Sequence, residues 1–245
     1  MADYVVTADM QRAEAMVASV LSSMDARIGQ ITGASGTGKT AAGKWLSQRF
    51  DGVRVCAIHG LTPGVLLQSV ARGFGLTVKF GQIGVAQVIE VLAPVVRDRL
   101  IVVDEANHLS WQCLEALRYL PDEHNAALVF TGTPIFSETL SKAQNRVLMA
   151  QLVRRIGAKR VVFDALGLEA IGEYVIGPRF GEVNKTIAKK FHTYSAGYWG
   201  EAVELADACA RIMAQNQQQK LTETIVDSAG HYLGRRAPHG KKAAA

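Results

Sequence analysis

The eight residues 33–40 read GASGTGKT, and this short run constrains the fold more than any other part of the chain. It meets the pattern G-x-x-x-x-G-K-[ST], whose glycines let successive backbone N–H groups point at phosphate oxygens. The apolar run Ile28–Thr32 before it predicts a strand, and the residues after it predict a helix over Thr40–Phe50. A helix N-terminus directed at such a loop favours a bound anion. A chance glycine-rich turn is the alternative, and the strand–loop–helix setting argues against it.

Individual residues of this P-loop have separate tasks. Lys39 supplies a positive charge to the β- and γ-phosphates of a nucleotide, and the Thr40 hydroxyl is a ligand for Mg²⁺. We therefore predict ATP and Mg²⁺ as cofactors. The predicted nucleotide-binding residues are Gly33, Ala34, Ser35, Gly36, Thr37, Gly38, Lys39, Thr40 and Ala41.

A second run, Leu100–Glu105, is typical of a buried strand that ends in two carboxylates. In a P-loop site, an acid at such a strand end holds the Mg²⁺ shell, and we assign this role to Asp104. Glu105 is placed to act as the general base that polarises the attacking water. The structural alternative is a carboxylate pair that merely caps the helix beginning at Ser110. Taken together, the two runs predict an ATPase, with Thr40 and Asp104 as its metal ligands.

Apolar runs alternate with helical patterns along the first two thirds of the chain, which predicts an α/β fold with a parallel five-stranded sheet and flanking helices. Strands are expected over Ile28–Thr32, Val53–Ile58, Leu100–Asp104, Ala127–Thr131 and Arg160–Phe163. Helices are expected over Thr40–Phe50, Pro63–Phe74, Val85–Arg97, Ser110–Tyr119 and Ser137–Ile156.

After Phe163 only helical patterns remain, with apolar residues at i, i+3 and i+4 spacing. They cover Leu168–Ile176, Asn184–His192, Glu201–Asn216 and Thr222–Leu233. We predict a nucleotide-binding domain over residues 1–165, a small helical lid over 166–234, and a disordered basic tail over 235–245.

Composition supports a folded protein, because 49% of the residues are hydrophobic and 20% are charged. No apolar run approaches the roughly 20 residues that span a bilayer, so we expect no membrane association. Three isolated cysteines favour reduced thiols and a cytoplasmic location. Residues 1–140 carry a net charge of −2 and residues 141–245 one of +7. Such an asymmetry suggests a polyanionic partner, although a solvated basic surface would look the same.

The apolar strand followed by Asp104-Glu105 resembles the AAA+ branch of P-loop ATPases. In this family a polar residue after a further strand contacts the γ-phosphate or the attacking water. The resemblance assigns this sensor-1 role to Thr133, with Thr131 as the fallback; an ordinary turn residue is the alternative. It also assigns Arg155, with Arg154 as the alternate, to the arginine finger that a neighbouring subunit inserts. A surface arginine at a helix end remains the other reading.

One AAA+ feature is missing from the sequence. The segment Gly197–Ala202 has no arginine at the place where many AAA+ lids carry a sensor-2 arginine. This departure puts sensor-2 assistance in doubt and suggests slow turnover.

The run Ile101–Leu109, followed by Leu114–Arg118, resembles the target-capture ATPases of Mu-like transposable phages and the related TnsC, TniB and IstB groups. Similar runs occur in secretion-associated ATPases of the ExeA type. Two departures stand out. No helix-turn-helix appendage precedes Gly33, and the helix that carries a basic cluster in the Mu group reads Gln87–Val91 here.

This resemblance implies an ATPase that binds double-stranded DNA without sequence preference, forms a helical filament with copies of itself, and recruits a DNA transposase. Sequence-independent binding requires Lys and Arg along phosphates. The candidate DNA contacts are Lys79, Lys142, Arg146, Lys185, Lys189 and Lys190. Two other hypotheses remain open: an ATPase that acts on protein partners in secretion or helicase loading, and a nucleotide-gated scaffold that hardly hydrolyses ATP.

Overall fold

The chain folds into two compact units. The computed structural model describes residues 4–77, 84–142, 146–181 and 184–235. The first unit comprises residues 1–34 and 39–163, and the second comprises residues 35–38 and 164–245. Lys79 and residues 236–245 of the predicted tail lie outside the described residues.

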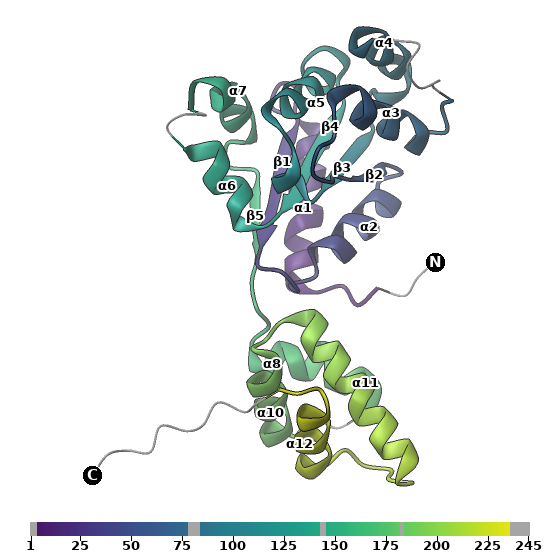
Figure 1. The fold of residues 1–245 in the computed structure, drawn as a ribbon, viewed down its shortest axis with the longest axis vertical. Coiled ribbons are helices and arrows are strands. Elements are labelled where there is room, and N and C mark those ends of the chain that lie inside the picture. The colour runs from purple at the N-terminus through teal and green to yellow at the C-terminus, as the bar shows by residue number, and fades with distance from the viewer. Residues whose placement is uncertain (1–3, 78–83, 143–145, 182–183, 236–245) are drawn as a thin grey trace, which may run out of the picture. The chain divides into compact units, whose positions relative to one another are not determined.

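The first unit is built on a five-stranded parallel sheet in the order β2-β3-β4-β1-β5 (Figure 1). The strands are β1 (Ile28–Gly33), β2 (Val53–Cys56), β3 (Leu100–Asp104), β4 (Ala127–Gly132) and β5 (Arg160–Phe163). Strands β1, β3 and β4 are buried along their whole length, because helices cover both faces of the sheet. The predicted α/β fold is confirmed.

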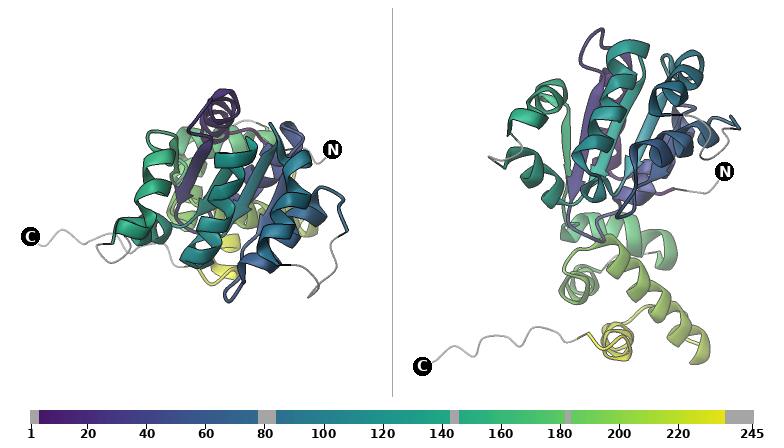
Figure 2. Two further views of the ribbon diagram at one scale, coloured as in Figure 1. Left: turned by 90° about the horizontal axis from the view of Figure 1, so that it is seen from above. Right: turned by 45° about the horizontal axis from the view of Figure 1, so that its top comes forward.

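Helices form one layer on each face of this sheet (Figure 2). Helices α1 (Ala8–Ser22) and α2 (Lys39–Arg49) cover one face. The opposite face is covered by α3 (Pro63–Gly73), α4 (Val85–Val96), α5 (Trp111–His124), α6 (Pro134–Ser141) and α7 (Arg146–Ile156). Parallel strands then place all their carboxyl ends at one edge of the sheet, and the loops that follow them gather there.

Two helical segments differ from the sequence prediction. Helix α1 was not predicted, because the polar start of the chain obscures the apolar stripe formed by Met10, Ala13, Val17 and Val20. The single helix expected over Ser137–Ile156 is two helices, since α6 ends at a Lys142 cap whose ψ is 140°. No glycine or proline marks that break in the sequence.

The second unit is entirely helical among its described residues. Its first helix, predicted over Leu168–Ile176, continues from α8 (Leu168–Ile171) through a π-helical turn (Gly172–Ile176) into α9 (Gly177–Phe180). The remaining helices are α10 (Lys185–Ser195), α11 (Trp199–Gln215) and α12 (Glu223–Tyr232). They enclose a separate core that includes Phe191, Leu205 and Val226.

Candidate active site

The P-loop joins β1 to α2 at the carboxyl edge of the sheet. Gly36 and Gly38 have φ angles of 82° and 95°, a region that side chains disfavour, so glycine is required at both positions. Gly33 instead ends β1 and is buried, and it is not among the residues with positive φ. The conformational freedom that the sequence assigned to three glycines is therefore used at two of them.

Lys39 is the first residue of α2 and is 6% exposed. Its Nζ donates a hydrogen bond to the Ala34 carbonyl oxygen at 2.7 Å, so the side chain folds back over the P-loop. Burial lowers the pKa of Lys39, while the nearby charges of Glu105 and Asp104 act to raise it. The lysine and the two predicted acids are therefore close enough for their charges to interact.

Asp104 ends β3, and donors surround its carboxylate. Oδ1 accepts hydrogen bonds from the Thr131 hydroxyl and, at 3.0 Å, from the Glu105 backbone N–H. Oδ2 accepts two from Arg54, at 3.2 Å from Nε and 2.5 Å from Nη2. Burial acts to raise the pKa of Asp104, yet hydrogen bonds from Thr131, Arg54 and Thr40 outweigh it and the pKa is lowered. The carboxylate is therefore ionised at neutral pH, as a metal ligand must be.

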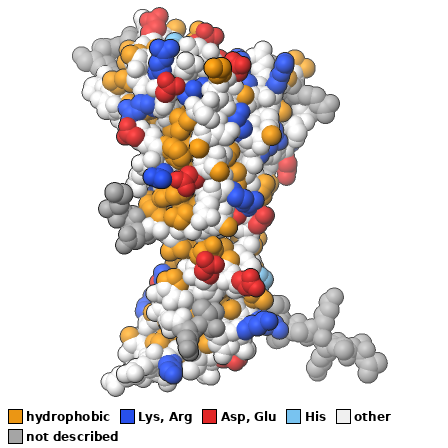
Figure 3. Space-filling model, turned by 180° about the vertical axis from the view of Figure 1, so that it is seen from behind, with side chains coloured by type: hydrophobic (Ala, Val, Ile, Leu, Met, Phe, Trp, Pro, Cys, Tyr) orange, Lys and Arg blue, Asp and Glu red, His pale blue; other side chains and the backbone are white. Residues whose placement is uncertain are grey.

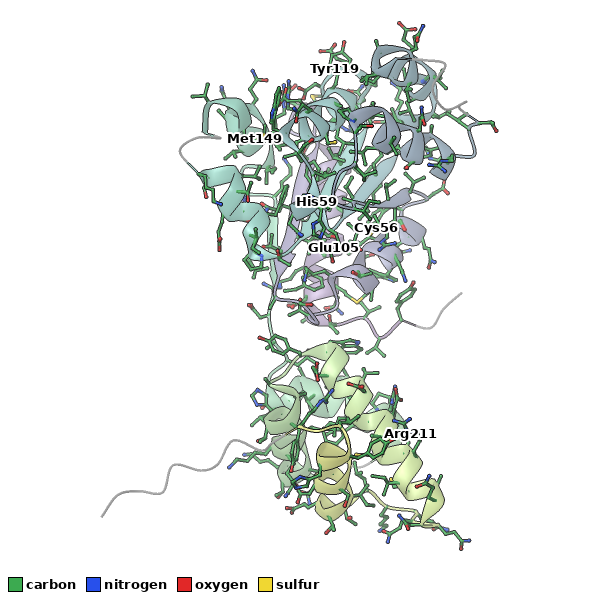
Figure 4. All side chains as sticks on the ribbon, viewed as in Figure 1. Cys56, His59, Glu105, Tyr119, Met149 and Arg211 are labelled. Carbon is green, nitrogen blue, oxygen red and sulfur yellow. The ribbon has the colours of Figure 1, made fainter. Side chains whose placement is uncertain are left out.

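Glu105 adopts a left-handed backbone conformation, with φ 56° and ψ 38°. Such a conformation is uncommon for a residue with a side chain and is typical of active sites. It turns the chain out of β3, so that Glu105 lies next to Asp104 with its side chain only half-buried. Cys56, the last residue of the neighbouring strand β2, pairs in register with Asp104, and Figure 4 labels it together with Glu105 and His59. The predicted general base thus lies in the same loop cluster as the P-loop.

The structure distinguishes the two sensor-1 candidates. The Thr131 side chain is fully buried and its hydroxyl donates to Asp104. The Thr133 hydroxyl is also buried, but it has no hydrogen-bond partner among the described residues. An unsatisfied buried hydroxyl is costly, and a ligand is one way to satisfy it. Thr133 therefore fits a contact with bound phosphate or water, whereas Thr131 supports Asp104.

Arg155 lies far from the P-loop of its own chain. It belongs to α7, which precedes the start of β5, so it lies at the amino edge of the sheet. The six-residue strand β1 separates the two edges by roughly 20 Å. The Nε atom of Arg155 lies 2.7 Å from Asp122 Oδ1, without the alignment of a hydrogen bond. A role for Arg155 in hydrolysis is thus possible only at the site of another copy.

The predicted DNA-contacting lysines differ in their surroundings. Lys142, Lys185 and Lys189 are exposed, and the last two lie on one face of α10. Lys190 instead pairs with Asp227 at 2.6 Å within the second unit, so its charge is already partly neutralised. Arg146 begins α7, and its side chain lies outside the described residues, as Lys79 does.

The described arginines of the second unit all have partners within that unit. Arg179 pairs with Asp207, and Arg211 lies over the Tyr232 ring. Arg235 pairs with two glutamates of α11 and also donates to the Glu201 carbonyl oxygen at 2.7 Å. Each of these three described arginines already has a partner within the second unit.

Two residues at the site were not assigned by sequence reasoning. The sequence pattern predicts only that Arg54 belongs to a strand, and nothing near it in the sequence indicates that its side chain reaches Asp104. Asn107 accepts a hydrogen bond from the Thr133 backbone N–H at 3.1 Å, which fixes the turn that carries Thr133. Its place in the run after Glu105 was the available signal, but no spacing rule connects it to residue 133.

Parts of the chain are similar to known proteins. Residues 22–140 match the family described as an AAA domain. The match covers just under half of the chain, and it points to ATP binding. Over 58 residues the chain is 45% identical to a Staphylococcus aureus protein named as a potential ATP-binding protein, a stretch that spans 24% of this chain and 19% of that relative.

Solved structures extend the likeness to nearly the whole chain. The ORC2 protein of Aeropyrum pernix, in ADPNP–ADP complexes, aligns with a TM-score of 0.70 and 15% identity over 94% of this chain and 70% of its own. The RuvB Holliday junction branch migration motor of Thermotoga maritima aligns with a TM-score of 0.59 and 11% identity, over 92% and 68%. At such identities the likeness establishes the fold alone. Among the described residues, no helix has the length and apolar character needed to cross a membrane.

Proposed function

We propose that this protein is a Mg²⁺-dependent AAA+ ATPase that binds duplex DNA without sequence preference, assembles with copies of itself on the DNA, and recruits and activates a DNA transposase. One observation carries the ATPase part of the proposal. The ionised Asp104 carboxylate is hydrogen-bonded to Thr40, and its negative charge interacts with the positive charge of Lys39. A carboxylate and a hydroxyl are oxygen donors of the kind that Mg²⁺ prefers.

The side chains around Asp104 divide the chemistry of hydrolysis. Lys39 and the P-loop N–H groups bind the β- and γ-phosphates, and Thr40 and Asp104 hold the metal. When bound, Mg²⁺ neutralises charge on the transferring phosphate. Glu105 accepts a proton from the attacking water, and the Thr133 hydroxyl donates to the phosphate or positions that water. The lysine, the two acids and the threonine all lie at the carboxyl edge of the sheet, which is why they act together.

Hydrolysis in this proposal requires a second copy of the chain. Arg155 lies at the opposite sheet edge from Glu105, so it completes the site of a neighbour rather than its own. A neighbour's arginine would stabilise charge that develops during phosphoryl transfer. Assembly on DNA would then be the event that switches hydrolysis on.

The DNA part of the proposal is supported by charge. The net +7 of residues 141–245 and the exposed pair Lys185 and Lys189 favour contact with phosphates. On the face drawn in Figure 3, the described basic side chains are interspersed with acidic ones, so this face is not favoured for the contact. A structural relative that is named as a Holliday junction branch migration motor adds support for a nucleic-acid partner.

Duplex binding with and without an ATP analogue tests this proposal. A labelled duplex should bind tightly with ATPγS at low salt, bind weakly without nucleotide, and lose affinity steeply as salt rises. The double variant Lys185→Glu/Lys189→Glu should weaken binding at least tenfold. The matched control Lys220→Glu makes half the charge change on an exposed residue of the same unit and should leave binding within about twofold. Affinity that does not respond to ATPγS would overturn the DNA role.

A role on protein partners remains the second candidate, because α5 carries two exposed aromatic residues. Trp111 is 48% exposed and Tyr119 is 45% exposed. Aromatic residues are enriched in protein interfaces. Two results together would replace the DNA role with this candidate. The rate of ATP hydrolysis would be the same with and without DNA, and Trp111→Ala would abolish capture of a protein partner other than a transposase.

A further inference from the structure

Arg54 is the residue around the site whose role neither the motif nor the resemblance explains. It lies on the edge strand β2, paired in register with Val102, and the pair Cys56–Asp104 follows two residues later. Because side chains alternate along strands, Arg54 and Asp104 lie on the same face of the sheet. The arginine therefore extends along the sheet toward its carboxyl edge.

The contacts of Arg54 occupy the outer oxygen of Asp104. Nε lies 3.2 Å and Nη2 2.5 Å from Oδ2, a two-pronged contact of the kind that makes arginine–carboxylate pairs strong. The Arg54 side chain is 20% exposed and that of Asp104 is 2% exposed, so water screens the pair only weakly. Gly43 of α2 faces this pair, and a Cβ added there would meet Arg54 Cδ at 3.8 Å. The helix thus packs directly over the arginine.

Asp104 consequently has little acceptor capacity left. A carboxylate offers about four lone-pair sites. Two are used on Oδ2 by Arg54 and two on Oδ1 by Thr131 and the Glu105 N–H, and the Thr40 hydroxyl is a fifth donor to the carboxylate. A metal ion, or a water bound to one, can reach Asp104 only if a donor withdraws. Thr40 would itself be a ligand of the metal, and Thr131 is fully buried. Arg54, with one-fifth of its side chain exposed, is therefore the donor that competes with the metal.

We propose that Arg54 is a built-in cation that competes with Mg²⁺ for Asp104 and so sets the Mg²⁺ concentration that the nucleotide complex requires. This inference rests on the proposed magnesium site and adds a positioning residue to it. Without metal, Arg54 compensates the buried charge of Asp104. When Mg²⁺ binds, the guanidinium gives up at least one hydrogen bond and stays as a like charge beside the metal, which weakens metal binding.

The Mg²⁺ dependence of nucleotide binding tests this role. A fluorescent ATP analogue that resists hydrolysis is titrated with Mg²⁺ at fixed, subsaturating nucleotide concentration. Arg54→Gln should lower the Mg²⁺ midpoint roughly tenfold, from the loss of one positive charge about 4–5 Å from a divalent ion. Nucleotide affinity in EDTA should change far less. Arg49→Gln also removes one arginine from the first unit, where Arg49 pairs with Glu14, and should leave the midpoint unchanged.

Different failures point to different parts of the argument. A midpoint that stays equal or rises in Arg54→Gln would overturn the role of Arg54 alone. A wild-type protein whose nucleotide binding ignores Mg²⁺ would overturn both that role and the magnesium site. If Arg54→Gln does not fold, Arg54→Met keeps the length of the stem and carries the same test. Thermal unfolding of the nucleotide complex over the same Mg²⁺ series should also show the lowered midpoint, which a merely misfolded site would not.

Discussion

The two edges of the sheet each hold a buried aspartate between basic partners, and the two are stabilised differently. At the carboxyl edge, five donors from four residues outweigh the burial of Asp104 and lower its pKa. At the amino edge, Asp122 pairs with Arg118 and Arg155, yet burial outweighs both and its pKa is raised. Hydrogen bonds therefore hold one carboxylate ionised, whereas burial disfavours the charge of the other, which still pairs with two arginines. The first arrangement suits a permanent ligand.

The strongest test of this contrast places a defect at the carboxyl edge in one copy of the chain and a defect at the amino edge in another copy. Glu105→Gln and Arg155→Ala should each lower the ATPase rate roughly a thousandfold, because one removes the base and the other the finger. A mixture should recover hydrolysis, since some interfaces then pair an intact Glu105 with an intact Arg155. Phosphate release is the measurement. Arg154→Ala is the control and should keep the rate; if it abolishes hydrolysis instead, the finger is Arg154, and no recovery on mixing would exclude action between copies.

A smaller effect should distinguish two threonines at the carboxyl edge. Thr133→Val removes a hydroxyl without a partner among the described residues and should lower kcat ten- to a hundredfold while ATP affinity stays constant. Thr131→Val instead removes a donor to Asp104 and should lower the melting temperature of the nucleotide-free protein. Single-turnover kinetics and thermal unfolding measure the two outcomes. The distinction fails if both variants behave alike.

At the amino edge, Asp122→Ala should lower the free energy of unfolding by about 1–2 kcal/mol, because two arginines lose the oxygen atoms that they share while Arg155 remains one-third exposed and screened. Denaturant titration measures this loss. Asp207→Ala is the matched control, since its pair with Arg179 is exposed, and it should change stability by at most a few tenths of a kcal/mol. Equal losses in both variants would mean that the amino edge holds no special contact.

The smallest expected effect is a pH dependence. Because the folded protein raises the pKa of Asp122 above its unfolded value, the fold binds a proton more readily than the unfolded chain does. Stability linked to Asp122 is therefore present below the unfolded pKa of about 3.9 and lost as pH rises through the folded pKa. The free energy of unfolding of the wild type, minus that of Asp122→Asn, should rise as pH falls from 6 to 4, because Asn does not titrate. A difference that shrinks over this range would show that the arginines dominate.

Sequence reasoning can propose site residues where these are neighbours in the chain. The P-loop and Asp104-Glu105 are continuous runs, each next to a strand that the apolar pattern predicts, so they could be found without a fold. Arg54 could not, because its partner is 50 residues away and the contact depends on which strands pair. The Arg155–Asp122 contact is hidden for the same reason, since it joins α7 to α5. The choice between Thr133 and Thr131 as the sensor-1 residue required knowing which of the two hydroxyls already donates a hydrogen bond within the protein.

Cysteine placement gives this protein a practical property. Cys113 and Cys209 are buried, and burial raises the pKa of the Cys209 thiol to about 12. Cys56 is exposed, and it pairs in register with Asp104 across β2 and β3. A thiol-reactive fluorophore should therefore label the native chain at one position, a single strand away from the carboxylate. The unmodified sequence thus carries its own attachment point for an optical reporter of nucleotide loading.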